Sequence, residues 1–245
     1  RRRCPEPAGT LVSNSGVGPV AELAYTLSLG SEYMAALKER GISADTAAGA
    51  MRFTFAIGPD FFPEIAKLRA ARMLWAAIVK EYGAANEASA FMHIHSVTGR
   101  WNKTLYDPYV NMLRTQTEAM SAALGGAGSI TVEPFDTVFR SANEFSERIA
   151  RNQQLLLAEE SHLDKVADPG AGSYYIEELT SLIAAEAWKL FTAIEEDGGF
   201  LTALRKGILQ DRISAAAASR KADMARRKEI LLGTNQYPDF RESKA

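Results

Sequence analysis

Two of the chain's three histidines, His93 and His95, are separated by a single residue. On a β-strand this spacing turns both imidazole rings to the same face. An imidazole can bind a metal ion or transfer a proton near neutral pH. A metal ion would need further ligands, and the remaining histidine, His162, falls in a predicted helix that need not lie nearby. We therefore expect no metal site.

His95 is the histidine nearer the carboxyl end of its predicted strand, which makes it the candidate catalytic residue. Two interpretations of this side chain stay open on the residues alone. It could donate a proton or a hydrogen bond to a substrate carbonyl. It could equally be a core histidine that hydrogen-bonds to neighbouring backbone.

Arg114 and Asn14 are candidate substrate-binding residues. Arg114 shares a predicted helical face with Asn111 and Glu118. Its guanidinium group could hold a carboxylate or phosphate through two hydrogen bonds. The spacing favours instead a structural ion pair with Glu118, four residues further on. Asn14 follows the predicted strand 10–13, at the end where a ligand would bind.

The elements that must position these residues alternate along the chain. Short β-branched or aromatic runs precede long amphipathic stretches. The predicted strands are 10–13, 52–57, 90–96, 129–132, 165–167 and 229–233. The predicted helices are 19–40, 61–82, 109–124, 144–160 and two or three within 175–228, divided at Gly198-Gly199 and Gly207. In helix 61–82 we place Lys67, Arg69, Arg72 and Lys80 on the wetter side.

This alternation predicts an α/β fold with a parallel sheet, built as one domain over residues 1–245. No G-x-G-x-x-G motif supports a dinucleotide-binding sheet. A TIM-type (β/α)8 barrel is therefore favoured, with about six of its strands present and further helices at the C-terminus. The active site of such a barrel lies at the carboxyl ends of the strands. That rule selects Asn14, Gly58, residues 95–99, residues 132–134 and the glycine-rich loop 168–172.

Composition excludes several classes of protein. The chain has 28 Lys and Arg against 30 Asp and Glu, so no excess of positive charge points to nucleic acid. No apolar run approaches the roughly 18 residues of a membrane span. The single cysteine, Cys4, cannot form a disulfide within the chain, and we expect a cytoplasmic protein. The basic start lacks the apolar stretch of a secretory signal, and we expect residues 1–9 to be disordered.

Several longer strings resemble the methylmalonyl-CoA mutase family. They occur in the family's order between about residues 14 and 237. They are ELAYTL (22–27), FFPEIAKLRAARMLW (61–75), YDPYVNMLRT (106–115), RIARN (148–152), DPGAGSYY (168–175) and GTNQY (233–237). The resemblance therefore covers most of the chain and does not depend on one short motif.

The resemblance implies a barrel that threads an acyl-CoA through its centre. It also implies adenosylcobalamin on a separate C-terminal domain and a radical rearrangement between methylmalonyl-CoA and succinyl-CoA. The cobalamin-ligating motif D-x-H-x-x-G does not occur in this chain, so we expect no cobalamin-binding domain in it. Since the family barrel is longer, we expect the chain to be the C-terminal part of one, truncated at its N-terminus.

Polar residues of the family's catalytic chains are missing here. Their pattern R-T/A-H-S/C-Q-T-S-G-W reads HIHSVTGRW at residues 93–101, which places His95 on the histidine implied to contact the substrate thioester. Their G-G-T-Q-S-L-H-T-N reads GGAGSITVE at residues 125–133, and R-I-E-E reads RISA at residues 212–215. Losing several polar contacts together indicates a site that is no longer used.

The family includes heterodimers of a catalytic large subunit and a related, inactive small subunit. The strings at residues 93–96, 106–115 and 229–238 resemble the small subunit. The resemblance thus implies a small subunit that supports a large subunit carrying adenosylcobalamin, with contact to acyl-CoA left open. The alternative is a catalytic acyl-CoA mutase barrel that uses His95 on the thioester carbonyl, with cobalamin on another chain.

Overall fold

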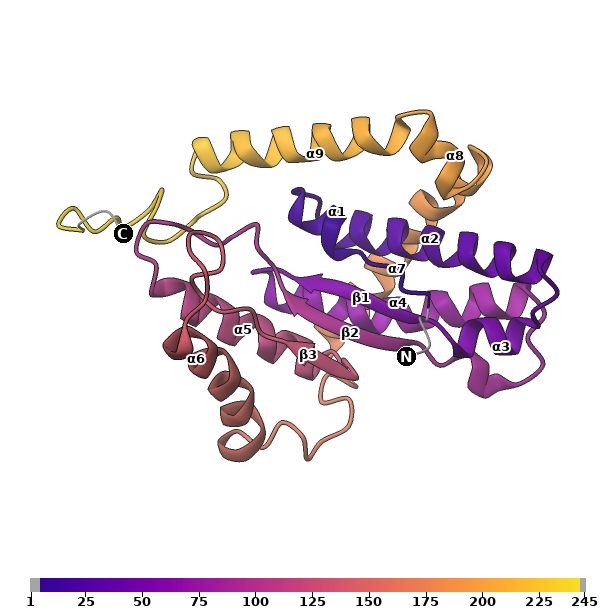
Figure 1. Cartoon of the computed structure of the whole chain (residues 1–245), viewed down its shortest axis with the longest axis horizontal. Coiled ribbons are helices and arrows are strands. Elements are labelled where there is room, and N and C mark those ends of the chain that lie inside the picture. The colour runs from indigo at the N-terminus through magenta and orange to yellow at the C-terminus, as the bar shows by residue number, and fades with distance from the viewer. Residues whose placement is uncertain (1–4, 243–245) are drawn as a thin grey trace.

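A computed structural model describes residues 5–242 of the chain. Its centre is a parallel sheet of β1 (Arg52–Ile57), β2 (His93–Thr98) and β3 (Ser129–Thr131), in that order. Helix α4 (Phe61–Glu81) joins β1 to β2, and α5 (Val110–Leu124) joins β2 to β3 (Figure 1). The described residues therefore form consecutive βαβ units, which confirms the predicted α/β class.

The remaining helices surround this unit. They are α1 (Thr10–Asn14), α2 (Pro19–Glu39), α3 (Ala44–Gly49), η1 (Glu87–Ala90), α6 (Glu144–Leu155), η2 (Leu156–Glu160), α7 (Tyr174–Glu196), α8 (Phe200–Arg205) and α9 (Ile208–Ala225). Proline at the start of α2 suits the first helical turn, which needs no backbone donor. As predicted, glycines with positive φ separate α7, α8 and α9. Between residues 5 and 242 no helix has the length and apolar character to cross a membrane.

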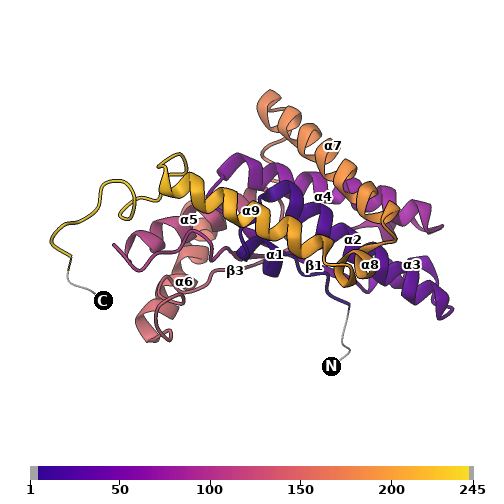
Figure 2. The ribbon, with the colours of Figure 1, turned by 90° about the horizontal axis from the view of Figure 1, so that it is seen from above.

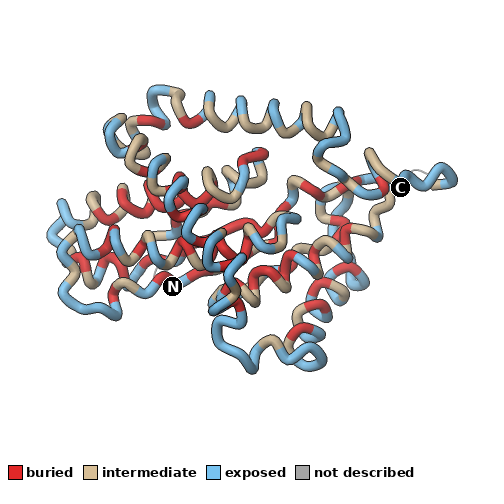
Figure 3. The backbone as a smooth tube through the Cα atoms, turned by 180° about the vertical axis from the view of Figure 1, so that it is seen from behind, coloured by how far each residue is buried: buried red, intermediate tan, exposed pale blue. Residues whose placement is uncertain are grey.

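One face of the sheet forms the hydrophobic core. Phe53, Phe55 and Ile57 alternate along β1 and are fully buried. Trp75 of α4 meets Phe53 edge to face, with ring centroids 4.5 Å apart. Helices α2 and α7 pack against α4, and Figure 2 shows α4 and α7 along the same side of the molecule. In Figure 3 the buried residues follow the strands, α2 and α4, whereas α9 is mostly exposed or half-buried.

The other face of the sheet is polar, because alternate residues of each strand point to it. It carries Arg52, Thr54, His93, His95, Ser129 and Thr131. Register places His95 beside Thr54 on one side and beside Ser129 on the other. In the part of the chain that the structure describes, the sheet is open and does not close into a barrel.

The prediction of six strands is wrong, because three strands form in residues 5–242. Residues 10–13 belong to α1, and residues 165–167 lie in an irregular loop. Residues 229–233 contribute only an isolated bridge between Leu232 and Gln236. The last two runs are too short and too exposed to bury an apolar face, and Val166 is 59% exposed.

The predicted disorder of residues 1–9 is wrong for residues 5–9, while residues 1–4 lie outside the described part. Pro5 and Pro7 accept hydrogen bonds from the amides of Arg52 and Thr54, at 3.2 and 3.0 Å. The amide of Gly9 donates to the carbonyl of Thr54 at 2.8 Å. Residues 5–9 thus continue the sheet beyond β1, a few residues before the strand predicted at 10–13.

Candidate functional site

The carboxyl ends of the strands bring together four of the predicted site segments, namely Asn14, Gly58, residues 95–99 and residues 132–134. The amide of Gly99 donates to the carbonyl of Ile57 at 2.7 Å, which joins the ends of β1 and β2. A Cβ atom on Gly99 would lie 2.9 Å from that oxygen, so this contact requires glycine. Asn14 reaches the same place from α1, where its Oδ1 accepts from the amide of Arg100 at 2.8 Å. We call the ends of β1 to β3 with these loops the strand-end mouth.

Loop 168–172, in contrast, lies away from the strand-end mouth. Asp168 forms an ion pair with Arg69 of α4, and Arg69 also pairs with Glu177 of α7 at 2.7 Å. The loop therefore fastens the start of α7 to α4 in the helical layer. Its expected place among the active-site segments is wrong.

His95 is held between the hydroxyl groups of β3. Its Nδ1 lies 2.8 Å from Oγ of Ser129, and its Nε2 lies 3.2 Å from Oγ1 of Thr131. Burial, followed by the positive charge of Arg52, lowers the pKa of His95, so the ring is neutral at neutral pH. A neutral imidazole has one donor and one acceptor, and both are used within the sheet.

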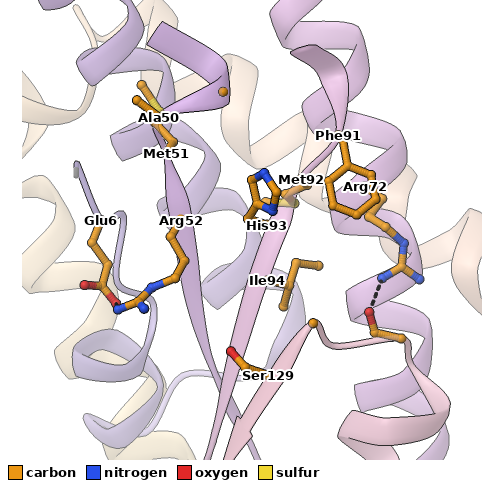
Figure 4. A pocket seen from close by; sticks show the side chains of 13 residues that line it. Glu6, Ala50, Met51, Arg52, Arg72, Phe91, Met92, His93, Ile94 and Ser129 are labelled. Carbon is orange, nitrogen blue, oxygen red and sulfur yellow. Dashed lines mark hydrogen bonds and ion pairs between the residues drawn. The ribbon is translucent and has the colours of Figure 1, made fainter. Parts of the chain in front are cut away.

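His93 lies on the same face but does not meet His95 in a shared site. Its ring packs edge to face against Phe91, with centroids 5.0 Å apart. It lines a cavity of about 1000 Å³ at the amino ends of the strands, together with Arg52, Arg72 and Ser129. Figure 4 shows Arg52 beside Glu6 on one side of this cavity and Arg72 on the other. No group of three potential metal ligands converges anywhere in residues 5–242.

Arg114 borders a cavity of about 530 Å³ that Pro59 and Asp60 also line, and its guanidinium group is held there by other parts of the chain. Its Nη1 donates to Oδ1 of Asn111 at 2.6 Å, and its Nη2 donates to the carbonyl of Leu232 at 2.6 Å. Arg114 therefore ties the C-terminal segment to α5. The predicted ion pair with Glu118 is wrong, because Glu118 binds Lys103 instead.

The sequence of residues 8–245 matches the family model described as methylmalonyl-CoA mutase. The chain belongs to the methylmalonyl-CoA mutase family. It is 50% identical over 232 residues to the methylmalonyl-CoA mutase small subunit of Porphyromonas gingivalis, across 94% of this chain and 38% of that protein. The large subunit from the same organism is 40% identical over 230 residues, which are 94% of this chain and 32% of that protein.

A methylmalonyl-CoA mutase of Cereibacter sphaeroides is 43% identical across 94% of this chain and 32% of its own length. The chain therefore spans between about a third and two fifths of the length of these relatives. Within that span the resemblance extends across the sheet, the surrounding helices and the strand-end mouth. Membership of the mutase family is thus shown independently of the geometry.

The methylmalonyl-CoA mutase family is generally dependent on cobalamin. The motif that the resemblance implies for cobalt binding uses a histidine, whose imidazole must be free of other partners. Both ring nitrogens of His95 are engaged by Ser129 and Thr131. The ring of His93 packs against Phe91, and His162 lies in an exposed turn after η2. These histidines do not converge at the strand-end mouth, so the described residues do not fit a cobalt ligand there.

Two buried charged clusters escaped prediction from the sequence. In the first, Lys103 donates to both carboxylate oxygens of Glu118, at 2.6 and 2.8 Å, and Asn102 donates to the same carboxylate at 2.8 Å. Burial raises the pKa of Glu118 to about 7, against the opposing charge of Lys103. The one sequence signal was the helical spacing of Glu118 from Asn111 and Thr115, which are also buried.

The second cluster centres on Lys67, which is fully buried although the sequence placed it on the wetter side of α4. Its Nζ lies 2.6 Å from Glu22 and 2.5 Å from Glu64. Burial opposes the charge on Lys67, but the two carboxylates outweigh it and hold its pKa above the usual value. Glu22 accepts a hydrogen bond from the amide of Ala56, and Lys67 donates one to the carbonyl of Ala56. The two side chains thus satisfy the backbone groups of Ala56 on the edge of β1 that does not pair with β2.

Proposed function

We propose that this chain is part of the small subunit of an adenosylcobalamin-dependent methylmalonyl-CoA mutase. In this proposal it supports a catalytic large subunit in a cytoplasmic heterodimer, and the isomerisation of methylmalonyl-CoA and succinyl-CoA belongs to the complex. Residues 1–245 would form one partial acyl-CoA mutase barrel domain. The greater identity to the P. gingivalis small subunit than to its large subunit supports this choice.

One observation carries the proposal: the polar groups expected to meet a substrate are engaged inside the chain. His95 uses both ring nitrogens on β3, and Asn14 accepts from the amide of Arg100. Arg114 holds Asn111 and the carbonyl of Leu232. A catalytic site needs donors directed at the reacting atoms. These three side chains make hydrogen bonds to the protein instead.

Acyl-CoA contact remains part of the proposal, at the cavity rather than at the mouth. Arg72 donates to the carbonyls of Gly125 and Gly126, which are neutral partners, and Arg52 borders the same cavity. Guanidinium groups of this kind suit the phosphates of a coenzyme A ester. In this proposal the large subunit supplies the cobalt ligand, because the described histidines do not.

The test is an assay of the purified full-length protein with adenosylcobalamin and methylmalonyl-CoA, first alone and then with the large subunit. We expect no succinyl-CoA from the chain alone and turnover from the mixture. Turnover by the chain alone would favour the alternative, a catalytic barrel that uses His95 on the thioester carbonyl. Equal turnover by the large subunit with and without this chain would contradict the supporting role.

A further inference from the structure

Arg100 and Glu133 form a two-pronged ion pair across the strand-end mouth. Arg100 follows β2, and Glu133 follows β3. Nε of Arg100 donates to one carboxylate oxygen at 2.7 Å, and Nη2 donates to the other at 2.5 Å. The side chain of Glu133 is 20% exposed and that of Arg100 is 52% exposed, so the two-pronged geometry, and not burial, distinguishes this pair from an ordinary surface pair.

The backbone on both sides of this pair is held as well. The amide of Arg100 donates to Oδ1 of Asn14 at 2.8 Å, which links the loop to α1. The amide of Glu133 donates to Oγ1 of Thr98 at 2.9 Å, which links the end of β3 to β2. Three segments far apart in the sequence are therefore joined through one arginine and one glutamate.

The pair consists of two departures from the catalytic pattern. The resemblance at residues 93–101 and 125–133 implies glycine at the position of Arg100 and asparagine at the position of Glu133 in catalytic chains. Glycine has no side chain to reach β3, and asparagine could not form this ion pair. Arg100 and Glu133 bind each other, so the two replacements together add one ion pair to the strand-end mouth.

We propose that Arg100, Glu133 and Asn14 hold the loop between β2 and α5 in place and keep the carboxyl ends of β2 and β3 together at the strand-end mouth. We call these three residues the clasp. The proposal rests on the proposed function, in which this mouth no longer serves a substrate. Arg100 is then a positioning residue. A ligand would need open space between the ends of these elements. The ion pair of Arg100 with Glu133 and the hydrogen bond of its amide to Asn14 instead fix β2, β3 and α1 to one another.

The rest of the loop is consistent with a fixed position. Arg220 of α9 lies over the ring of Trp101, 5.3 Å from its centroid, and also binds Glu229. Next along the chain, Lys103 is bound to Glu118. Of these three contacts, the one made by Arg100 reaches the end of the neighbouring strand β3, while the other two reach α9 and α5. Loss of Arg100 should therefore increase the mobility of the ends of β2 and β3 first.

Amide hydrogen exchange of the full-length protein, read by mass spectrometry, tests the clasp without any assay of activity. Arg100→Gln and Glu133→Gln should each raise exchange about tenfold in peptides covering residues 98–104 and 129–135. Asn14→Ala should raise exchange at residues 98–104 and leave residues 129–135 unchanged. Arg100→Lys keeps the positive charge but cannot donate to both carboxylate oxygens in the geometry of a guanidinium group, so it should give an exchange rate between those of the parent protein and Arg100→Gln.

Arg52→Gln is the matched control, because the side chain of Arg52 is exposed to a similar degree and pairs with Glu6 at the amino end of β1, away from the strand-end mouth. It should leave both peptides unchanged. The double variant Arg100→Gln/Glu133→Gln should exchange no faster than either single variant. Additive effects, or unchanged exchange in both single variants, would overturn the clasp. Neither outcome depends on whether the chain turns over substrate, so this test and that of the proposed function fail separately.

Discussion

Thr131 Oγ1 lies 3.2 Å from Nε2 of His95, across the boundary between β3 and β2. By the resemblance at residues 125–133, Thr131 stands at the position implied to be a histidine in catalytic chains. A hydroxyl group therefore stands there in place of a second imidazole, and it binds the first. With Ser129 on the other ring nitrogen, His95 becomes part of the sheet.

Replacing His95 by alanine should therefore change turnover of the assembled mutase by less than about tenfold, which is roughly 1.4 kcal/mol in the barrier. The loss of two hydrogen bonds on a partly exposed face should cost about 1 kcal/mol of stability. Steady-state kinetics of the reconstituted complex would measure the first effect, and denaturant unfolding the second.

His93→Ala is the control for that experiment, since His93 lies on the same strand and face and packs against Phe91. Both variants should retain turnover. A drop well beyond tenfold in His95→Ala alone would assign His95 a role in the reaction, and it would favour the catalytic alternative.

Replacing Lys67 by methionine should destabilise the fold strongly, because Glu22 and Glu64 would be left buried without their counter-ion. Removing one partner of a buried ion pair typically costs about 3–5 kcal/mol. Lys189 is the matched control: it pairs with Glu186 at 2.6 Å, but both side chains are exposed. Lys189→Met should change the free energy of unfolding by less than about 0.5 kcal/mol. Equal effects of the two substitutions would show that burial does not decide the outcome.

Lys67 also shows where prediction from the sequence stops. The helical period of residues 61–82 correctly predicts α4, which spans Phe61–Glu81. The same period cannot reveal that Glu22, 45 residues earlier, lies against Lys67. A lysine is normally assigned to solvent, and only the packing of α2 on α4 makes it a core residue.

For Lys67 the helix was predicted correctly and the side-chain environment was not. For the strands the prediction of the element itself failed, because a strand forms only where another segment supplies its backbone hydrogen-bond partners. Pro5 and Pro7 suggest an irregular segment, because proline lacks an amide donor. Their carbonyls nevertheless accept from β1, which requires no donor from either residue. Conversely, the apolar runs at 165–167 and 229–233 find no strand to pair with in the part of the chain the structure describes. Asn14 and Gly99 lie at the carboxyl ends of the strands as predicted, whereas the prediction for His95 is wrong: β2 runs on to Thr98, so His95 lies in the middle of that strand. The internal partners of these residues were not predictable.

Gly30 is a position in α2 where a methyl group should not fit. A Cβ atom there would lie 2.9 Å from Cε1 of Phe53 and 3.0 Å from Cζ3 of Trp75. Both rings are fully buried, so neither can move aside freely. Gly30→Ala should cost about 1–3 kcal/mol of stability, whereas Gly49→Ala, which meets no atom within 4 Å, should cost nothing. Thermal unfolding of the two variants would compare them directly, and equal melting temperatures would contradict the close packing of α2 on β1.

The buried Glu118 should make stability fall as the pH rises from about 4.5 to 7. Its pKa in the folded state is about 7, against 4.5 for an ordinary glutamate, so the folded chain keeps a proton that the unfolded chain releases. A raised carboxyl pKa gives stability that is complete below the unfolded value and is lost as the pH passes the folded value. Each unit of difference is worth about 1.4 kcal/mol, and the loss is therefore on the order of 3 kcal/mol.

Glu118→Gln cannot titrate, so its free energy of unfolding should depend less on pH across this window. At pH 7.5, where Glu118 of the parent protein is ionised, the variant should also be the less stable of the two, because Lys103 lacks its buried counter-ion. Urea unfolding of both proteins at pH 5 and pH 7.5 provides the comparison. Parallel pH profiles would show that Glu118 is ionised throughout, and that its ion pair with Lys103 outweighs the cost of burial.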